Sequence, residues 1–252
     1  MNKEEITFQY LLHLGDNSLI LGQRIAEWCG HGPILEQDIA LTNISLDLFG
    51  ESRNIYQYAA QLKGDNHTED SLAFLRDVLE FKNVLLVEQP NIDWAYTICR
   101  QFFFDTFHFY LQHELLKSKD ERIVEIANKA IKESAYHLKW SSEWMIRLGD
   151  GTEISHQKIQ NAVNDLWEFT GELFIPSEIE TLAYQSGIGA DLNNIKQLWH
   201  EKVKAILDEA TIQIPTNDFF QKGGKNGIHS EHLGFVLAEM QYLQRVHPGA
   251  EW

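Results

Sequence analysis

The placement of proline is the feature that most restricts the fold of this chain. Only 5 of the 252 residues are proline, and Pro33, Pro90, Pro176 and Pro215 lie between long segments whose apolar residues recur at helical spacing. Proline lacks an N–H donor and clashes with the preceding helical turn, so confining it to junctions leaves long helices intact. No segment shows the sustained alternation of a half-buried strand. We therefore predict an all-α fold.

The predicted helices differ in length and in role. They cover about 16–29, 36–62, 68–87, 94–117, 121–148, 155–174, 176–185, 191–212 and 230–246, with Ser230 as N-cap of the last. Segments 16–29, 36–62, 94–117 and 121–148 are expected to form a four-helix bundle, with 68–87 in a long crossover. The short link "KSKD" predicts that 94–117 and 121–148 pack antiparallel, and "QKGGKNG" predicts a flexible basic loop. We expect one domain over 1–252, with a core bundle at about 16–148 and a C-terminal helical extension at about 155–252.

Charge and cysteine content narrow the possible partners and the compartment. The chain has 37 acidic and 21 basic residues, a formal net charge of −16, which disfavours binding to nucleic acid or to anionic membranes. Cys29 and Cys99 form no metal or redox motif and no disulfide framework. No apolar run reaches the roughly 18 residues needed to cross a bilayer. These features predict a soluble protein of the reducing cytoplasm.

Each of the four long helices carries polar residues at one-turn spacing. They are Gln23 and Glu27; Asp47, Glu51 and Asn54; Asp105 and His108; and Glu133 and His137. In a four-helix bundle, such residues could converge on one interior point, as the ligands of a di-iron carboxylate site do.

A di-iron site needs about four carboxylates and two imidazoles, each imidazole placed by a Glu-x-x-His step. In this chain Glu51 is followed at the third position by Asn54, and Glu133 is followed by His137 at the fourth. Three interpretations remain open: an intact di-iron site, a vestigial polar cluster without metal, and ordinary solvated helix faces. If the carboxylates are buried without iron, Arg53, Arg100 or Lys132 could supply the positive charge.

Several long strings, in order, carry a resemblance to a known family. They are "LGDNSLILGQRIAEWCGHGP", "ALTNISLDLFGESRNIYQYAA", "LLVEQPN", "KAIKESAYHL", "RLGDGT" and "HSEHLGFVLAEMQYLQRVHPGAEW". Together they resemble the C-type (PaaC) subunits of phenylacetyl-CoA epoxidase complexes, over residues 14–252. The resemblance implies a ferritin-like fold and a role in aerobic phenylacetate degradation.

The resemblance also implies partners and cofactors. In that family a homologous A-type subunit holds the di-iron centre, a reductase subunit supplies electrons from NADPH, and the C-type subunit is a non-catalytic support. The expectation for this chain is therefore no catalytic residue, no metal and no cofactor of its own, with a vestigial cluster at the polar positions above. The aromatic run "FFFDTFHFY" suits either a large interface with the A-type subunit or the chain's own core. Without its partner, the chain could form homodimers.

Contact between this chain and substrate is expected at most at an interface. The crossover offers Phe81, Lys82 and Asn83 as substrate-binding candidates, with an ordinary crossover as the alternative. Lys222 and Lys225 in the glycine-rich loop are further candidates for binding an anion.

The alternative function is an independent di-iron oxidoreductase or iron-handling protein that uses Glu51, Asp105, His108, Glu133 and His137.

Overall fold

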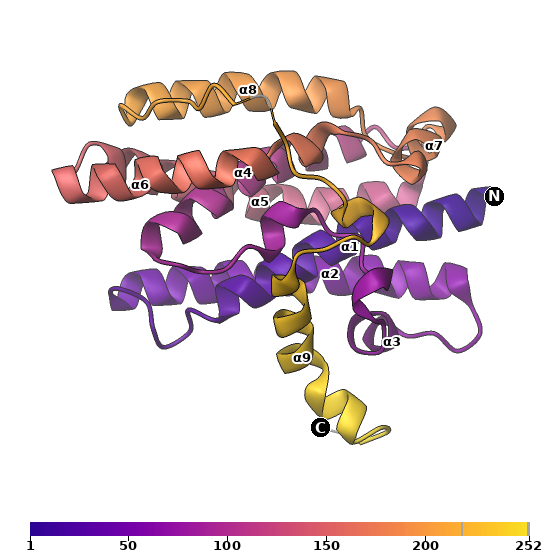
Figure 1. Ribbon diagram of the computed structural model, residues 1–252. Coiled ribbons are helices and arrows are strands. Elements are labelled where there is room, and N and C mark those ends of the chain that lie inside the picture. Colours follow the sequence, from indigo (N-terminus) through magenta and orange to yellow (C-terminus); the bar gives the residue numbers. More distant parts are fainter. Residues whose placement is uncertain (218, 251–252) are drawn as a thin grey trace. The chain divides into compact units, whose positions relative to one another are not determined.

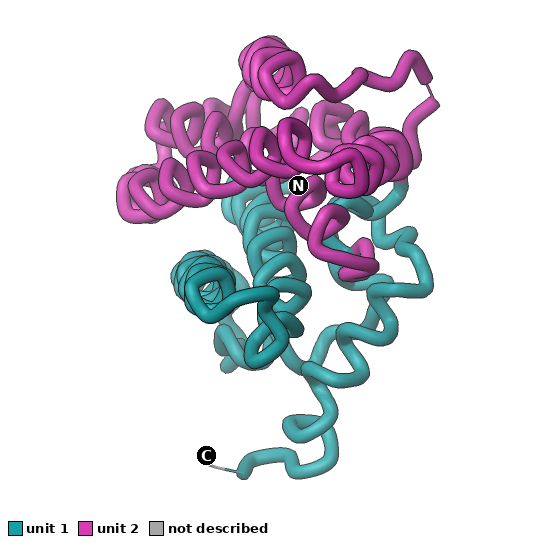
Figure 2. The backbone as a smooth tube through the Cα atoms, turned by 90° about the vertical axis from the view of Figure 1, so that its left-hand side faces the viewer, with its two compact units in different colours: residues 1–88, 223–252 teal, residues 89–222 magenta. Residues whose placement is uncertain are grey.

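The computed structural model describes residues 1–217 and 219–250, and these residues form α-helices, short 3-10 turns and connecting segments (Figure 1). The prediction of an all-α chain is confirmed. Residue 218 and residues 251–252, which fall within the predicted C-terminal extension, lie outside the described residues. The chain divides into two compact units, residues 1–88 with 223–252 and residues 89–222 (Figure 2). Among the described helices, none is long and apolar enough to span a membrane.

The first unit is built on two long helices, α1 (Lys3–Ala26) and α2 (Leu35–Lys63), which pack against each other. Two glycines of α1 allow the close approach. A Cβ at Gly15 would lie 2.6 Å from the Tyr56 ring, and one at Gly22 would lie 2.8 Å from the Phe49 ring. The predicted start of the first helix at residue 16 was wrong, because Gly15 lies inside α1 as a packing position and the helix extends back to Lys3.

The crossover is not the continuous helix that its local pattern predicts over 68–87. It consists of the short helix α3 (Glu69–Phe74) and 3-10 turns at Val78–Glu80 and Leu85–Glu88. Side chains of α1 capture its backbone, since Asp16 accepts from the N–H of Lys82 and Asn17 accepts from the N–H of Val84. Tertiary hydrogen bonds thus override the local helical preference.

The loop "QKGGKNG" is also different from its prediction as a flexible basic segment. Lys225 is buried, and the segment contains a 3-10 turn at Gly224–Asn226. A Cβ at Gly224 would lie 2.2 Å from the carbonyl oxygen of Asn83, so only glycine permits this contact with the crossover. The loop leads into α9 (Glu231–Val246), whose N-cap is Ser230 as predicted.

The second unit begins with α4 (Trp94–Leu115) and α5 (Glu121–Gly149), which pack against each other across a short link. It continues with α6 (Glu153–Leu166), 3-10 turns at Trp167–Phe169 and Gly171–Phe174, α7 (Glu178–Ser186) and α8 (Leu192–Glu209). The helix predicted over 155–174 therefore ends at Leu166 and gives way to two tight turns.

The aromatic residues of α4 contribute to the core of the second unit. The Phe103 ring contacts Trp167 and Trp199, with centroids 5.7 Å away in both cases, and Phe107 contacts Phe174 at 6.0 Å. Trp199 is fully buried and donates its indole N–H to the carbonyl of Phe103 at 2.8 Å. The run "FFFDTFHFY" was interpreted either as an interface or as part of the chain's own core. For Phe103 and Phe107 the structure supports the core.

Candidate functional site

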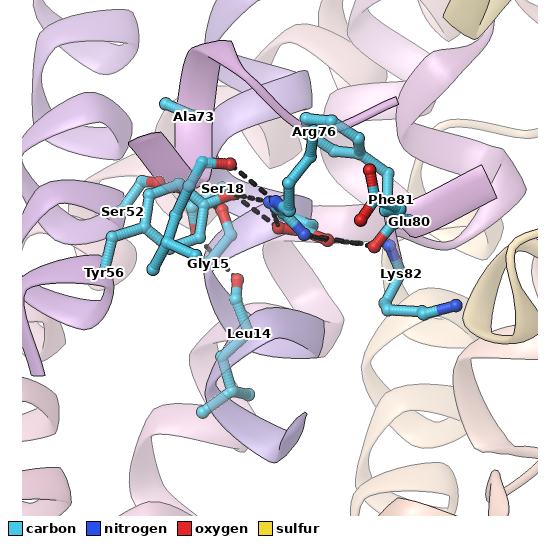
Figure 3. A network of polar contacts seen from close by, with 12 residues as sticks. Leu14, Gly15, Ser18, Ser52, Tyr56, Ala73, Arg76, Glu80, Phe81 and Lys82 are labelled. Carbon is cyan, nitrogen blue, oxygen red and sulfur yellow. Dashed lines mark hydrogen bonds and ion pairs between the residues drawn. The ribbon is translucent and has the colours of Figure 1, made fainter. Parts of the chain in front are cut away.

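A buried ion pair in the first unit fixes the crossover to α1 (Figure 3). The Arg76 guanidinium donates to both carboxylate oxygens of Asp16, at 2.5 and 3.0 Å, and the Tyr56 hydroxyl donates to Asp16 Oδ1 at 2.5 Å. Arg76 also donates to the carbonyls of Leu72 and Glu80. All the polar atoms of this pair are therefore engaged, as a buried charge pair requires.

The electrostatics of this network favour the ionised pair. Burial alone would lower the pKa of Arg76, but the adjacent Asp16 carboxylate raises it above its ordinary value. Burial and then Asp16 raise the pKa of Tyr56 well above the ordinary value, so this phenol remains a donor. The Arg76 guanidinium also lies 4.2 Å from the centroid of the Phe81 ring, a cation–π contact.

A second buried network joins the other end of the crossover to the segment before α9. Glu88 is fully buried, and its carboxylate accepts from the N–H of Ser230 at 2.7 Å and from the amide of Asn83 at 3.1 Å. His229 bridges two groups: Nδ1 lies 3.0 Å from Glu88 Oε2, and Nε2 lies 2.9 Å from the Phe81 carbonyl. A carbonyl can only accept, so Nε2 carries a proton.

The three substrate-binding candidates of the crossover lie in different environments. Phe81 and Asn83 are fully buried, Phe81 beneath Arg76 and Asn83 against Glu88. Lys82 is half-buried and lines a cavity of about 530 Å³, together with Lys63 and His67. Substrate contact by these residues stays a prediction, and Lys82 is placed at the wall of this cavity. Of the predicted anion-binding lysines, Lys222 is exposed and Lys225 is buried.

In the second unit, the predicted polar residues of α4 and α5 gather in a buried cluster. Asp105, His108 and His137 are all buried. Gln101 donates to Asp105 Oδ1 at 2.5 Å, and the Gln112 amide lies 2.8 Å from His108 Nε2. Burial raises the pKa of Asp105 to about 6, although His137 and His108 act in the opposite direction. Glu133, one turn before His137, is only half-buried.

The predicted polar residues of α1 and α2 vary in exposure. Glu51 is buried, whereas Gln23, Asp47 and Asn54 are half-buried. The Asn54 amide donates to the Gly50 carbonyl of its own helix at 2.7 Å. Glu27 is exposed and pairs with Arg24 at 2.8 Å.

The donor set does not fit a pair of iron ions. On α2, the position of an expected imidazole is occupied by Asn54, whose amide is bonded to its own helix. On α4, glutamine amides contact Asp105 and His108, the positions where a metal would require free lone pairs. Among the described residues, no group of three or more His, Cys, Asp or Glu side chains has the geometry to hold a metal ion.

The sequence suggested three cations that could supply positive charge in place of a metal, namely Arg53, Arg100 and Lys132. Two of them lie at the surface. Arg53 is exposed and lies 3.5 Å from Glu69 at the surface, and Lys132 is exposed. Arg100 is buried and donates to the Gln89 carbonyl and to Asn91. Sequence reasoning missed Arg76, Asp16, Glu88 and His229, although an arginine inside the apolar string "AFLRDVLEF" is a usable signal of a buried ion pair.

Substitution of Asp105 by asparagine is expected to stabilise the chain at neutral pH. The pKa of about 6 lies above the value near 3.8 of an unperturbed aspartate, so the folded state holds this proton more tightly than the unfolded state. Stability contributed by Asp105 therefore falls as pH rises from about 4 to 6. The gain for Asp105→Asn should be near zero at about pH 4 and reach about 2 kcal/mol by pH 7.

Urea unfolding at both pH values measures this gain. Glu143→Gln, which removes an exposed carboxylate from α5, serves as the control and should change stability by less than about 0.5 kcal/mol at either pH. A gain that is equal at pH 4 and pH 7, or a loss of stability at pH 7, would contradict the assignment of a costly buried carboxylate.

Comparison with known proteins identifies the family to which this chain belongs. The model of the phenylacetic acid catabolic protein family (PaaA_PaaC) matches residues 1–252, and the chain belongs to this family. The all-helical structure is consistent with the ferritin-like helical bundle expected from the sequence.

A curated relative is similar over almost its whole length. It is the C-type subunit of the 1,2-phenylacetyl-CoA epoxidase of Escherichia coli (strain K12), to which the chain is 51% identical over 243 residues. The match covers 96% of this chain and 98% of that protein. The resemblance inferred from the sequence strings is confirmed.

Proposed function

We propose that this chain is the C-type subunit of a phenylacetyl-CoA epoxidase complex in phenylacetate catabolism. The observation that carries the proposal is the 51% identity to the C-type subunit of such an enzyme, over 96% of this chain and 98% of the relative. At this coverage the two proteins correspond over nearly their whole lengths. In this proposal the chain is one subunit of a monooxygenase complex, which is an oxidoreductase. It does not form a complete enzyme by itself.

We further propose that the chain is a non-catalytic support for a homologous A-type subunit that holds the di-iron centre. Two features of the donor set favour this role: the Asn54 amide that is bonded to its own helix, and the glutamine amides that contact Asp105 and His108. These two glutamine amides take up Asp105 Oδ1 and His108 Nε2, lone pairs that a metal ion would otherwise occupy. The rigid networks around Asp16 and Glu88 suit a chain whose task is to hold its neighbour in register.

The proposed complex also defines the cofactors, the compartment and the contact with substrate. The iron belongs to the A-type subunit, and a reductase subunit supplies electrons from NADPH. We expect the complex in the cytoplasm, where coenzyme A thioesters and NADPH are present. Substrate contact with this chain is proposed through Lys82 at the cavity of the crossover, with Phe81 and Asn83 as buried residues that position it.

Co-expression of this chain with an A-type subunit tests the proposal. We expect the two chains to purify as one stable complex and to form the ring epoxide of phenylacetyl-CoA with reductase and NADPH. Activity should fall by at least about 100-fold when either chain is omitted, because binding energy and ligand geometry both depend on the partner. Epoxidation by this chain and reductase alone would instead favour the independent di-iron oxidoreductase.

A further inference from the structure

A second cavity, in the unit of residues 89–222, has a chemistry that the proposed function does not use. Its volume is about 440 Å³, within the range of small-molecule sites. Its walls come from the two 3-10 turns after α6, from α8, and from the chain segment that follows α8. Together these walls contribute aromatic rings and basic groups.

The floor of this cavity is aromatic and firmly held. Trp167 and Phe174 are both buried and line the cavity, and each contacts Trp199 in the core, at 5.8 and 5.3 Å between ring centroids. Phe220 lies across Gly171, where a Cβ would come within 2.2 Å of the ring, so the absence of a side chain there admits the third ring. Two buried rings and the half-buried Phe220 ring around one space favour a flat, aromatic occupant.

The rim of the cavity is basic. Lys196 and His200 lie one helical turn apart on α8, and both line the cavity and are exposed. Of the lining side chains that the structure describes, none is acidic, in a chain whose net charge is −16. Partial desolvation lowers the pKa of His200 and the nearby Lys196 ammonium lowers it further, so the His200 ring is neutral at pH 7 and can donate one hydrogen bond.

We propose that this cavity binds a small aromatic carboxylate. Its ring would lie among Trp167, Phe174 and Phe220, and its carboxylate would pair with the Lys196 ammonium and accept a hydrogen bond from the His200 ring. One permanent cation matches one carboxylate, whereas a nucleotide with several phosphates would leave negative charge without a partner. An organic cation would be repelled by Lys196. This proposal does not rest on the function of the complex.

Methyl NMR of the chain titrated with phenylacetate tests the proposal. The Ile175 side chain lines the cavity, so its methyl resonance should shift when an aromatic ring enters. We expect saturation with a dissociation constant of about 0.1–1 mM, typical of a ligand of this size. Lys196→Gln should weaken binding about ten-fold, the value of one charge-assisted contact. Lys204→Gln removes a lysine from the same helix away from the cavity, so it should leave the affinity unchanged.

Two further ligands test the contact with the aromatic ring and the contact with the carboxylate separately. Cyclohexylacetate keeps the carboxylate but loses the flat ring, and 2-phenylethanol keeps the ring but loses the charge; each should bind at least about five-fold more weakly. No shift at Ile175 with about 10 mM phenylacetate would overturn the proposal. So would equal binding of 2-phenylethanol, or equal affinity of the wild-type chain and the Lys196→Gln variant. These outcomes are independent of whether the chain joins an epoxidase complex.

Discussion

The Arg76→Met variant is expected to lose about 3–5 kcal/mol of unfolding free energy, among the largest effects of any single substitution in this chain. Methionine keeps much of the packing volume but removes the guanidinium. The Asp16 carboxylate, whose side chain is 0% exposed, would then lie buried without its counter-charge. Chemical denaturation, followed by circular dichroism at neutral pH, measures the loss.

Two comparisons show whether this loss comes from the buried charge. Arg53→Met removes an exposed arginine that pairs with Glu69 at 3.5 Å and should cost less than about 0.5 kcal/mol. The double variant Asp16→Asn/Arg76→Met removes both charges and should be more stable than Arg76→Met alone by about 1–2 kcal/mol, because no charge is left unpaired. A loss below about 1 kcal/mol for Arg76→Met would contradict the account of this network.

The Glu88→Gln variant is expected to release the segment before α9 from the crossover and to cost about 3 kcal/mol. Both Asn83 and His229 lie at hydrogen-bonding distance from Oε2, and Ser230 donates to Oε1. A glutamine would place an amide NH₂ at one of these positions, where a donor would then meet a donor. At least one buried hydrogen bond is lost whichever way the amide is turned.

Hydrogen exchange measured by mass spectrometry locates this effect. Amides of α9 should exchange faster in Glu88→Gln, while amides of the 89–222 unit should keep their protection. Glu231→Gln, which changes an exposed carboxylate in the first turn of α9, is the matched control and should leave exchange nearly unchanged. Identical exchange in the Glu88→Gln variant and the wild-type chain would show that this contact does not hold α9.

The long helices could be predicted from sequence because their signals are local. The structure has α2 at Leu35–Lys63, where the sequence predicted 36–62, and α5 at Glu121–Gly149, where it predicted 121–148. Apolar spacing and N-caps such as Asp120, which accepts from the N–H groups of Arg122 and Ile123, lie within the segment itself.

The crossover could not be predicted in the same way, because its conformation depends on distant residues. Asp16 and Asn17 lie 66 and 67 positions before the N–H groups that they bind. Glu88 contacts His229, 141 positions later. Local periodicity carries no trace of such contacts, so the segment was predicted as a helix.

The candidate site was predicted in part. Asp105, His108 and His137 are buried near one another, whereas Glu133 of the same predicted set is half-buried. The amides that contact Asp105 and His108 were not foreseen, because Gln101 and Gln112 lie one turn from their partners on α4 and carry no charge to mark them. A support role was predicted from missing ligands and from whole-chain resemblance, and it remains the proposal to be tested.

The metal content of the co-expressed complex tests the central claim most directly. Elemental analysis should find about two iron atoms for each pair of one A-type and one C-type chain, the content of a single di-iron centre. The same content, and epoxidation within about two-fold, should persist when this chain carries Asp105→Asn together with His137→Gln, since neither residue would bind iron. About four iron atoms per pair, or loss of half the iron in the double variant, would show that this chain holds a metal centre of its own.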